Sequence, residues 1–293
     1  MLSLNKKLIT YSALLASLVL THPIYAAEKE VSFEVDGQKV VGTLETPENT
    51  SNPPVVLLLH GFMGHRHELP VKGTEEGVYS RTARVMAEHG LASLRIDFRG
   101  SGDSDGKWED TTFSRQIEDA NAAVNWLKNN KKINIEKIGV LGWSQGGLVA
   151  SHVAKLNPEI KSLALWGPVT HPFMTYSNLL GADFILEAVA SDPEKSFSTT
   201  TPWGNSTTLK SKFFKELFTK NPIGAIADYN GPLLVIRGTR DDLVISAESW
   251  MAYHDGEEKL VEFNTDHIWN VFSGPEVIDE KIIPETISWF IKM

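Results

Sequence analysis

Gly142-Trp143-Ser144-Gln145-Gly146-Gly147 is the stretch of sequence that decides the fold. The residues before it, 138–141, form a short apolar run typical of a buried strand, and 148–156 form a helical segment. A Gly-x-Ser-x-Gly sequence between a strand and a helix predicts a sharp turn that lifts the serine hydroxyl above the sheet. The flanking glycines allow the strand and the helix to approach closely. Ser144 is therefore the candidate nucleophile.

Short apolar runs and longer amphipathic segments alternate on both sides of this turn. One segment, 113–127, repeats its apolar residues at steps of four and three, which is typical of a helix packed on a sheet. The alternation predicts an α/β fold with a mostly parallel central sheet flanked by helices. The apolar runs that predict buried strands are 55–59, 91–96, 138–141, 163–166, 233–236 and 260–263.

Short sequence signals near residue 36 and near residue 284 predict a turn and the start of a helix. Asp36-Gly37 lies between two alternating segments and predicts the turn of an antiparallel hairpin. Pro284 is placed to open a last helix. The side chains that we expect this helix to pack on the sheet are Ile287, Phe290 and Ile291.

Two adjacent acids follow the predicted strand 233–236. A serine hydroxyl is a poor nucleophile at neutral pH, so it needs a base and an acid that orients the base. We assign the acid to Asp241, which comes three residues after the turn glycine Gly238. Asp242 is expected to point away or to cap the helix that begins near Ser246.

A histidine follows the last predicted strand. His267 lies in the loop after 260–263 and is the predicted base. His254 precedes that strand at a helix end, where we expect it to complement the helix dipole. Because open α/β sheets bind ligands outside the carboxyl ends of their strands, Ser144, Asp241 and His267 are predicted to converge.

The stretch His60-Gly61-Phe62-Met63-Gly64 follows the first buried strand. A glycine-rich turn there can present the backbone N–H of Phe62, and Gln145, the residue after the nucleophile, can present another. Together they would form an oxyanion hole, worth about 3 kcal/mol per donor. His60 is predicted to be a buried structural histidine.

Metal and cofactor chemistry is not expected. His65, His67 and Glu68 resemble a ligand set, but the sequence offers no further ligands at matching spacing. There is no cysteine among the 293 residues, which excludes disulfides, thiolate zinc sites and a cysteine nucleophile. We therefore predict neither a metal nor an organic cofactor.

The charge balance argues against nucleic acid as a partner. Lysines and arginines number 28 and acids 37, which gives a formal net charge of −9. A chain with this net negative charge is not expected to attract the negatively charged backbone of nucleic acid or a surface of anionic lipid. A small molecule is the expected partner.

Residues 1–26 have the pattern of a secretory signal peptide. Lys6 and Lys7 precede an apolar run over 8–20, and small residues follow at Ala26 and Ala27. The run is shorter than the roughly 20 residues that span a bilayer, so we expect no stable membrane insertion. An uncleaved N-terminal anchor is the alternative. Cleavage would leave one domain, 27–293, in the periplasm or outside the cell.

One connection is unusually long. About 65 residues separate the strands 163–166 and 233–236, whereas such connections usually run two to six. We predict a cap insertion over about 167–230, after the sixth strand. It is rich in aromatic residues, which favours a folded cap over a floppy linker. Most of these aromatics are expected to fill the small core of the cap itself.

Most of the mature chain resembles the α/β-hydrolase superfamily. The motifs that carry the resemblance are His60-Gly61-Phe62, Asp97-Phe98-Arg99-Gly100-Ser101-Gly102-Asp103-Ser104, Gly142-Trp143-Ser144-Gln145-Gly146-Gly147, the segment 238–244 and His267. Within the superfamily the chain looks most like small esterases that include cinnamoyl and feruloyl esterases, and like serine-aminopeptidase-like hydrolases. The resemblance implies that the insertion forms part of the substrate pocket.

These observations predict a serine hydrolase that cleaves carboxylic esters, cinnamoyl or feruloyl esters or short-chain acyl esters among them, through an acyl-enzyme. A serine at the nucleophile position argues against the dehalogenases and epoxide hydrolases of the superfamily, which use an aspartate there. A serine peptidase or thioesterase with the same residues is the first alternative. A non-catalytic binding protein on a hydrolase scaffold is the second.

Overall fold

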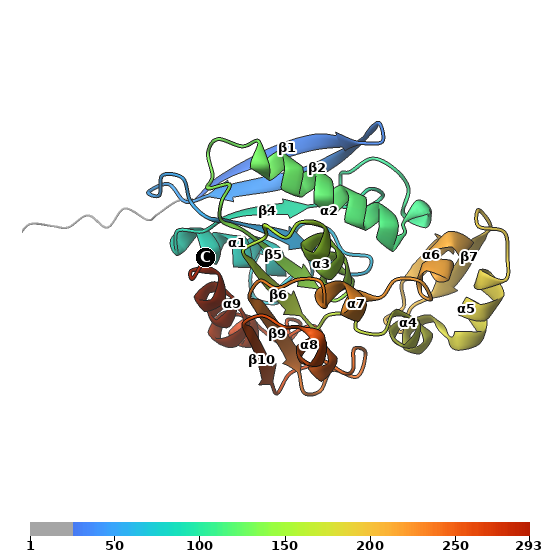
Figure 1. The fold of residues 1–293 in the computed structure, drawn as a ribbon. Coiled ribbons are helices and arrows are strands. Elements are labelled where there is room, and N and C mark those ends of the chain that lie inside the picture. Colours follow the sequence, from blue (N-terminus) through green and yellow to red (C-terminus); the bar gives the residue numbers. More distant parts are fainter. Residues whose placement is uncertain (1–25) are drawn as a thin grey trace, which may run out of the picture.

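The computed structural model describes residues 26–293, which fold around an eight-stranded sheet (Figure 1). Its strand order is β1-β2-β4-β3-β5-β6-β9-β10. The pairs from β4 to β10 are parallel, and β2 pairs antiparallel with both β1 and β4. The strands are β1 (Ala27–Val35), β2 (Gln38–Thr46), β3 (Val55–Leu59), β4 (Ala92–Ile96), β5 (Ile138–Trp143), β6 (Ser162–Trp166), β9 (Leu233–Gly238) and β10 (Glu258–Phe263). The predicted α/β fold is confirmed. The signal-peptide prediction for 1–26 falls almost wholly outside the described residues.

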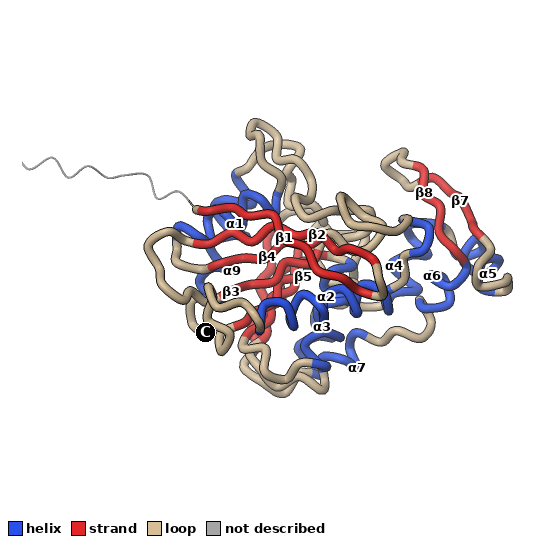
Figure 2. The backbone as a smooth tube through the Cα atoms, turned by 90° about the horizontal axis from the view of Figure 1, so that it is seen from above, coloured by secondary structure: helices blue, strands red, loops and turns tan. Residues whose placement is uncertain are grey.

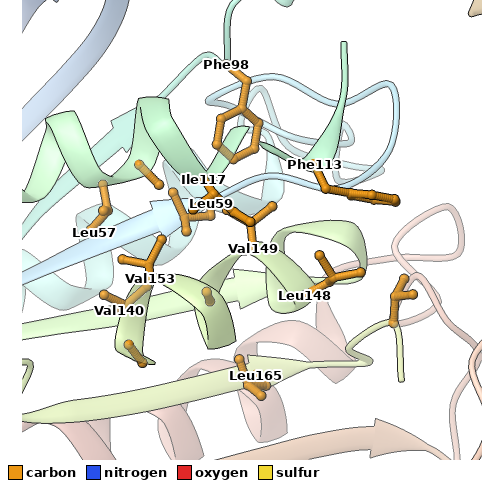
Figure 3. Packing of buried hydrophobic residues seen from close by; sticks show 14 of the residues in the cluster. Leu57, Leu59, Phe98, Phe113, Ile117, Val140, Leu148, Val149, Val153 and Leu165 are labelled. Carbon is orange, nitrogen blue, oxygen red and sulfur yellow. The ribbon is translucent and has the colours of Figure 1, made fainter. Parts of the chain in front are cut away.

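Helices cover both faces of the sheet (Figures 1 and 2). On one face lie α2 (Phe113–Lys128), α3 (Gln145–Leu156), α7 (Pro222–Ile226) and α8 (Glu248–Tyr253). On the other lie α1 (Val78–Glu88) and α9 (Ile283–Phe290). Every residue of β3 is buried, with Leu57 and Leu59 in the core beneath α2 and α3 (Figure 3) and Leu58 in the opposite core. This two-sided burial explains the uninterrupted apolar run.

The local signals at the ends are confirmed except at one residue. Asp36 and Gly37 both have positive φ, 51° and 73°, as a tight hairpin turn with this twist requires. Pro284 is in the first turn of α9, but a π-helical turn, Ile278–Ile282, already leads into it. The predicted packing of Ile291 is wrong: this side chain is 57% exposed. Ile291 follows the last residue of the helix, where no described element covers it.

The connection between β6 and β9 is folded. Its elements before α7 are α4 (Pro172–Leu180), α5 (Ala182–Val189), β7 (Ser196–Thr200), β8 (Ser206–Lys210) and α6 (Ser211–Glu216). Figure 1 shows them beside the carboxyl ends of the parallel strands, and Figure 2 shows the β7–β8 hairpin standing away from the sheet. Phe184, Phe197 and Phe214 pack on one another with ring centroids 5.6–6.2 Å apart, which makes a small core within the insertion.

Candidate active site

Ser144 occupies a strained turn between β5 and α3. Its φ of 55° lies in the left-handed region, which costs on the order of 1–3 kcal/mol for a residue with a side chain. Close backbone contacts hold the turn in place. A Cβ atom on Gly142 would lie 2.3 Å from the Gly146 carbonyl oxygen, and one on Gly146 would lie 2.0 Å from the Leu59 carbonyl oxygen. Only glycine fits at either position.

Gly146→Ala is expected to destabilise the fold by about 3 kcal/mol, because the added methyl must displace backbone rather than a flexible side chain. The matched control is Gly204→Ala, where positive φ costs about 1 kcal/mol but nothing lies within 4 Å of the new atom. Thermal unfolding measures both, and the Gly146 variant should lose about 6 °C or more. Equal losses in the two variants would contradict the steric argument.

The structure brings Ser144, His267 and Asp241 together from three separate loops. The Ser144 hydroxyl donates to His267 Nε2 at 3.0 Å, and His267 Nδ1–H donates to Asp241 Oδ2 at 2.6 Å. The other carboxylate oxygen, Oδ1, accepts the backbone N–H groups of Leu243 and Val244, both at 3.0 Å. This arrangement fixes the imidazole with Nε2 free to accept a proton from the serine.

The strands β9 and β10 set the distance between the acid and the histidine. They are adjacent and parallel, with Gly238 paired to Phe263 at their carboxyl ends. The loops that follow stay joined, because Arg240 N–H donates to the Thr265 carbonyl at 3.0 Å. α8 begins at Glu248, near Ser246 as predicted. Asp242 is exposed and hydrogen-bonds to no described residue. The capping role considered for Asp242 is therefore wrong.

Trp143 links the nucleophile turn to the histidine loop, a contact that the sequence analysis missed. Its indole N–H donates to the His267 carbonyl at 3.3 Å. The ring is 3% exposed and packs against Trp166 and Trp269. The sequence shows only that an aromatic residue directly precedes the serine, and this does not predict which residue its indole N–H contacts.

Two backbone amides lie beside Ser144: that of Phe62, in the loop after β3, and that of Gln145, the first residue of α3. A Cβ on Gly61 would lie 3.5 Å from Ser144 Cβ. The Gly61 carbonyl accepts from His60 Nδ1 at 2.9 Å and from Gly64 N–H at 3.1 Å, so the Phe62 N–H of the same trans peptide points the opposite way. Gln145 opens α3, where an N–H has no helical partner and the dipole is positive. Neither amide donates to another described residue.

His60 is structural, as predicted. It is fully buried, its Nε2 accepts the Phe98 N–H at 3.2 Å, and its Nδ1 donates to the Gly61 carbonyl. Burial lowers the pKa of His60 to about 4, so the ring is neutral at physiological pH. His254 follows the last residue of α8, at the helix end where it was expected, and its Nε2 donates to the Gly231 carbonyl at 2.9 Å.

Tyr176 of the insertion contacts both of the residues that carry these amides. The Phe62 ring makes edge contacts with Tyr176 of α4 and Trp108, with ring centroids 5.3 Å and 5.4 Å apart. The Tyr176 hydroxyl donates to Gln145 Oε1, and Gln145 Nε2 donates to Gln116 Oε1 at 2.6 Å. Tyr176 and Gln116 carry no sequence signal for this role.

Within residues 26–293, no group of three or more histidine or acidic side chains is arranged to hold a metal ion. Of the three residues considered as ligands, Glu68 is buried and accepts the Gly61 N–H instead. No helix in the same range is long and apolar enough to cross a membrane.

Comparisons with known proteins point to one family. A family model described as alpha/beta hydrolase fold matches residues 54–192. Thiohydrolase aneE of Aspergillus aculeatus is 31% identical in a match that covers 45% of this chain and 39% of the thiohydrolase. A putative esterase/lipase of Haemophilus influenzae is 30% identical in a match that covers 39% of this chain and 33% of the esterase/lipase. The chain spans less than half the length of the curated relatives it matches. Est1E of Butyrivibrio proteoclasticus with bound ferulic acid has the same fold, with a TM-score of 0.64, 24% identity, and 87% of this chain and 99% of Est1E covered.

Proposed function

We propose, from the premise that this chain is an alpha/beta hydrolase of the esterase-like superfamily, that it cleaves carboxylic esters with Ser144 as nucleophile. The observation that carries the proposal is the continuous chain of hydrogen bonds from Ser144 through His267 to Asp241. A serine alone does not react at neutral pH, and this chain supplies the base and the group that orients it.

The reaction has two steps. His267 Nε2 takes the hydroxyl proton as Ser144 Oγ attacks the ester carbonyl, and the Phe62 and Gln145 N–H groups bind the oxyanion. The tetrahedral intermediate collapses to an acyl-enzyme as His267 gives the proton to the departing alkoxide. Water then attacks the acyl-enzyme with His267 again as base, which returns Ser144 and releases the acid. Asp241 holds the imidazole and stabilises its positive charge throughout.

Several observations bear on the substrate. The rings of Trp108 and Tyr176 pack against Phe62, whose loop lies beside Ser144, and such aromatic surroundings suit cinnamoyl, feruloyl or short-chain acyl groups. The structural relative Est1E carries ferulic acid. The insertion, which supplies Tyr176, is proposed to border the substrate-binding site. A thioesterase is the second candidate, favoured by the match to a thiohydrolase. Serine peptidase activity, or binding without catalysis, would appear as outcomes of the test below.

Location is proposed from residues 1–26. The lysine-led apolar run followed by Ala26 and Ala27 directs export to the periplasm or the medium, with cleavage near residue 26. Fractionation of cells that express the full chain, followed by N-terminal sequencing, tests this directly. A product that stays in the cytoplasm with Met1 intact would exclude it.

Residues 27–293 should hydrolyse nitrophenyl esters and methyl ferulate faster than an acyl thioester or an aminoacyl amide. The panel includes nitrophenyl esters of increasing acyl length, which size the pocket because each methylene changes the preference by only about 1–3 kcal/mol. A fluorophosphonate should label Ser144, and the Ser144→Ala protein is the control. Faster thioester or amide turnover would replace the esterase assignment, and no turnover with unlabelled Ser144 would leave a binding protein.

A further inference from the structure

Glu68 is a buried acid that the reaction does not use, and it lies inside the loop that carries Phe62. The residue is 7% exposed, and its Oε1 accepts the Gly61 N–H at 2.5 Å. The carboxylate thus joins the start of the loop to its end.

The loop is built around this carboxylate. A Cβ on Gly64 would lie 2.8 Å from Glu68 Oε1, so the glycine leaves the space that the carboxylate fills. Met63 and Glu68 both have positive φ, 59° and 62°, a strained conformation that persists only when its surroundings hold it. In this backbone conformation the Glu68 side chain points back into the loop and reaches the Gly61 N–H.

The peptide that Glu68 holds is next to the reacting serine. Gly61 lies beside Ser144, and the following peptide bears the Phe62 N–H. His60 and Gly64 fix the carbonyl side of that peptide, whereas Glu68 fixes the N–H of Gly61 that precedes it. Loss of this bond would leave Gly61 held from its carbonyl side alone, which would loosen the orientation of the Phe62 N–H toward the oxyanion.

We propose that Glu68 is the positioning residue of the oxyanion loop: its ionised carboxylate holds Gly61 so that the Phe62 N–H faces the reacting carbonyl. The inference rests on the proposed function, because it assigns a role within the same site. Glu68 touches no reacting atom and acts through Gly61.

The charge on Glu68 changes within the range of pH in which the enzyme would be assayed. Burial raises the pKa of Glu68 to about 7, and the hydrogen bond from the Gly61 N–H only partly opposes that rise. The titratable group that faces it is the Tyr79 phenol of α1, which donates to the Leu59 carbonyl and whose own pKa is raised by burial and by the Glu68 charge. His67 of the same loop binds the Ser80 hydroxyl instead. The ionised form of Glu68, which holds the Gly61 N–H, therefore predominates above about pH 7 and is lost below it.

Glu68→Gln tests the proposal against a matched control, Glu45→Gln. Glu45 is 3% exposed, its pKa is also raised by burial to about 7, and it lies in β2, where it pairs with Arg95 at 3.3 Å. At about pH 8, we expect Glu68→Gln to lower kcat for a nitrophenyl ester about tenfold to hundredfold, with KM within about twofold. Glu45→Gln should keep the wild-type kcat.

The ratio of wild-type to variant kcat/KM separates positioning from general damage. Effects of pH that the two proteins share cancel from the ratio. For Glu68→Gln the ratio should shrink to within about threefold at about pH 5, where the wild-type Glu68 is protonated. For Glu45→Gln it should stay flat. A ratio that is constant across pH, or an equal loss of kcat in the two variants, would overturn the proposal.

Amide exchange tests the same contact without any turnover. In protein labelled with nitrogen-15 glycine, the Gly61 N–H should exchange about tenfold faster in Glu68→Gln than in wild type or Glu45→Gln. Unchanged Gly61 exchange would overturn the role of Glu68. If Glu68→Gln does not fold, the wild type alone still tests the contact. Its Gly61 N–H exchange, corrected for the intrinsic effect of pH, should accelerate below about pH 7. A Gly61 protection factor that does not change with pH would overturn the role of Glu68. A wild type with no ester turnover would instead overturn the proposed function, and Gly61 exchange would still decide on Glu68.

Discussion

Alanine in place of Ser144 is expected to lower kcat for ester hydrolysis on the order of 10⁶-fold, and alanine in place of His267 by a similar factor. The Ser144 hydroxyl and His267 Nε2 are 3.0 Å apart, so the serine loses its proton only through that ring. Either substitution removes the same step. Steady-state kinetics on a nitrophenyl ester measure both variants.

The double variant should be no slower than either single one, because the two side chains act as a unit. The activity that remains over the uncatalysed rate should come from the Phe62 and Gln145 amides and from binding, on the order of 10³-fold. Ser144 and His267 are both partly accessible, so alanine at either should leave the melting temperature near that of the wild type. Losses that multiply in the double variant would mean that Ser144 and His267 serve separate steps.

Most of the fold was predictable, because burial on both faces leaves a plain signature in the sequence. The run 55–59 became β3 without a change of boundary, since each of its side chains meets one of the two helical layers. Asp36-Gly37 forms the predicted hairpin because its positive φ values exclude most other residues. The error at Ile291 has a physical cause: apolar periodicity predicts which face a helix buries but not where the helix ends.

The order of the candidate site residues was predictable for a similar reason. Ser144, Asp241 and His267 each follow a strand, and parallel strands bring their carboxyl ends to one edge. Contacts between distant segments were not predictable. Trp143 meets the carbonyl of a residue 124 positions away, and Tyr176 meets a side chain 31 positions away in another element. No local pattern names such a partner, because any nearby donor or acceptor would satisfy the same group.

Asp241→Asn is expected to lower kcat about 10⁴-fold, with the fold intact. The reason lies in what holds the carboxylate. One of its oxygens accepts the N–H groups of Leu243 and Val244, so an asparagine must place its own oxygen there and turn its amide NH₂ toward His267 Nδ1. The ring would then accept at Nδ1 and carry its proton on Nε2. In that tautomer His267 cannot take the proton of Ser144.

Asp242→Asn is the matched control, since the same change one residue later removes an exposed charge that binds no described residue. Its kcat should stay within about twofold of the wild type, as surface substitutions rarely matter more. The pH dependence supplies a second check on Asp241→Asn, because a ring locked in the wrong tautomer gains activity only when hydroxide removes the proton from Nε2. Its residual kcat should therefore keep rising at alkaline pH, where the wild type has levelled off. A modest loss in Asp241→Asn with an unchanged profile would move the orienting role away from this carboxylate, and equal losses in the two variants would assign the effect to charge rather than to the tautomer.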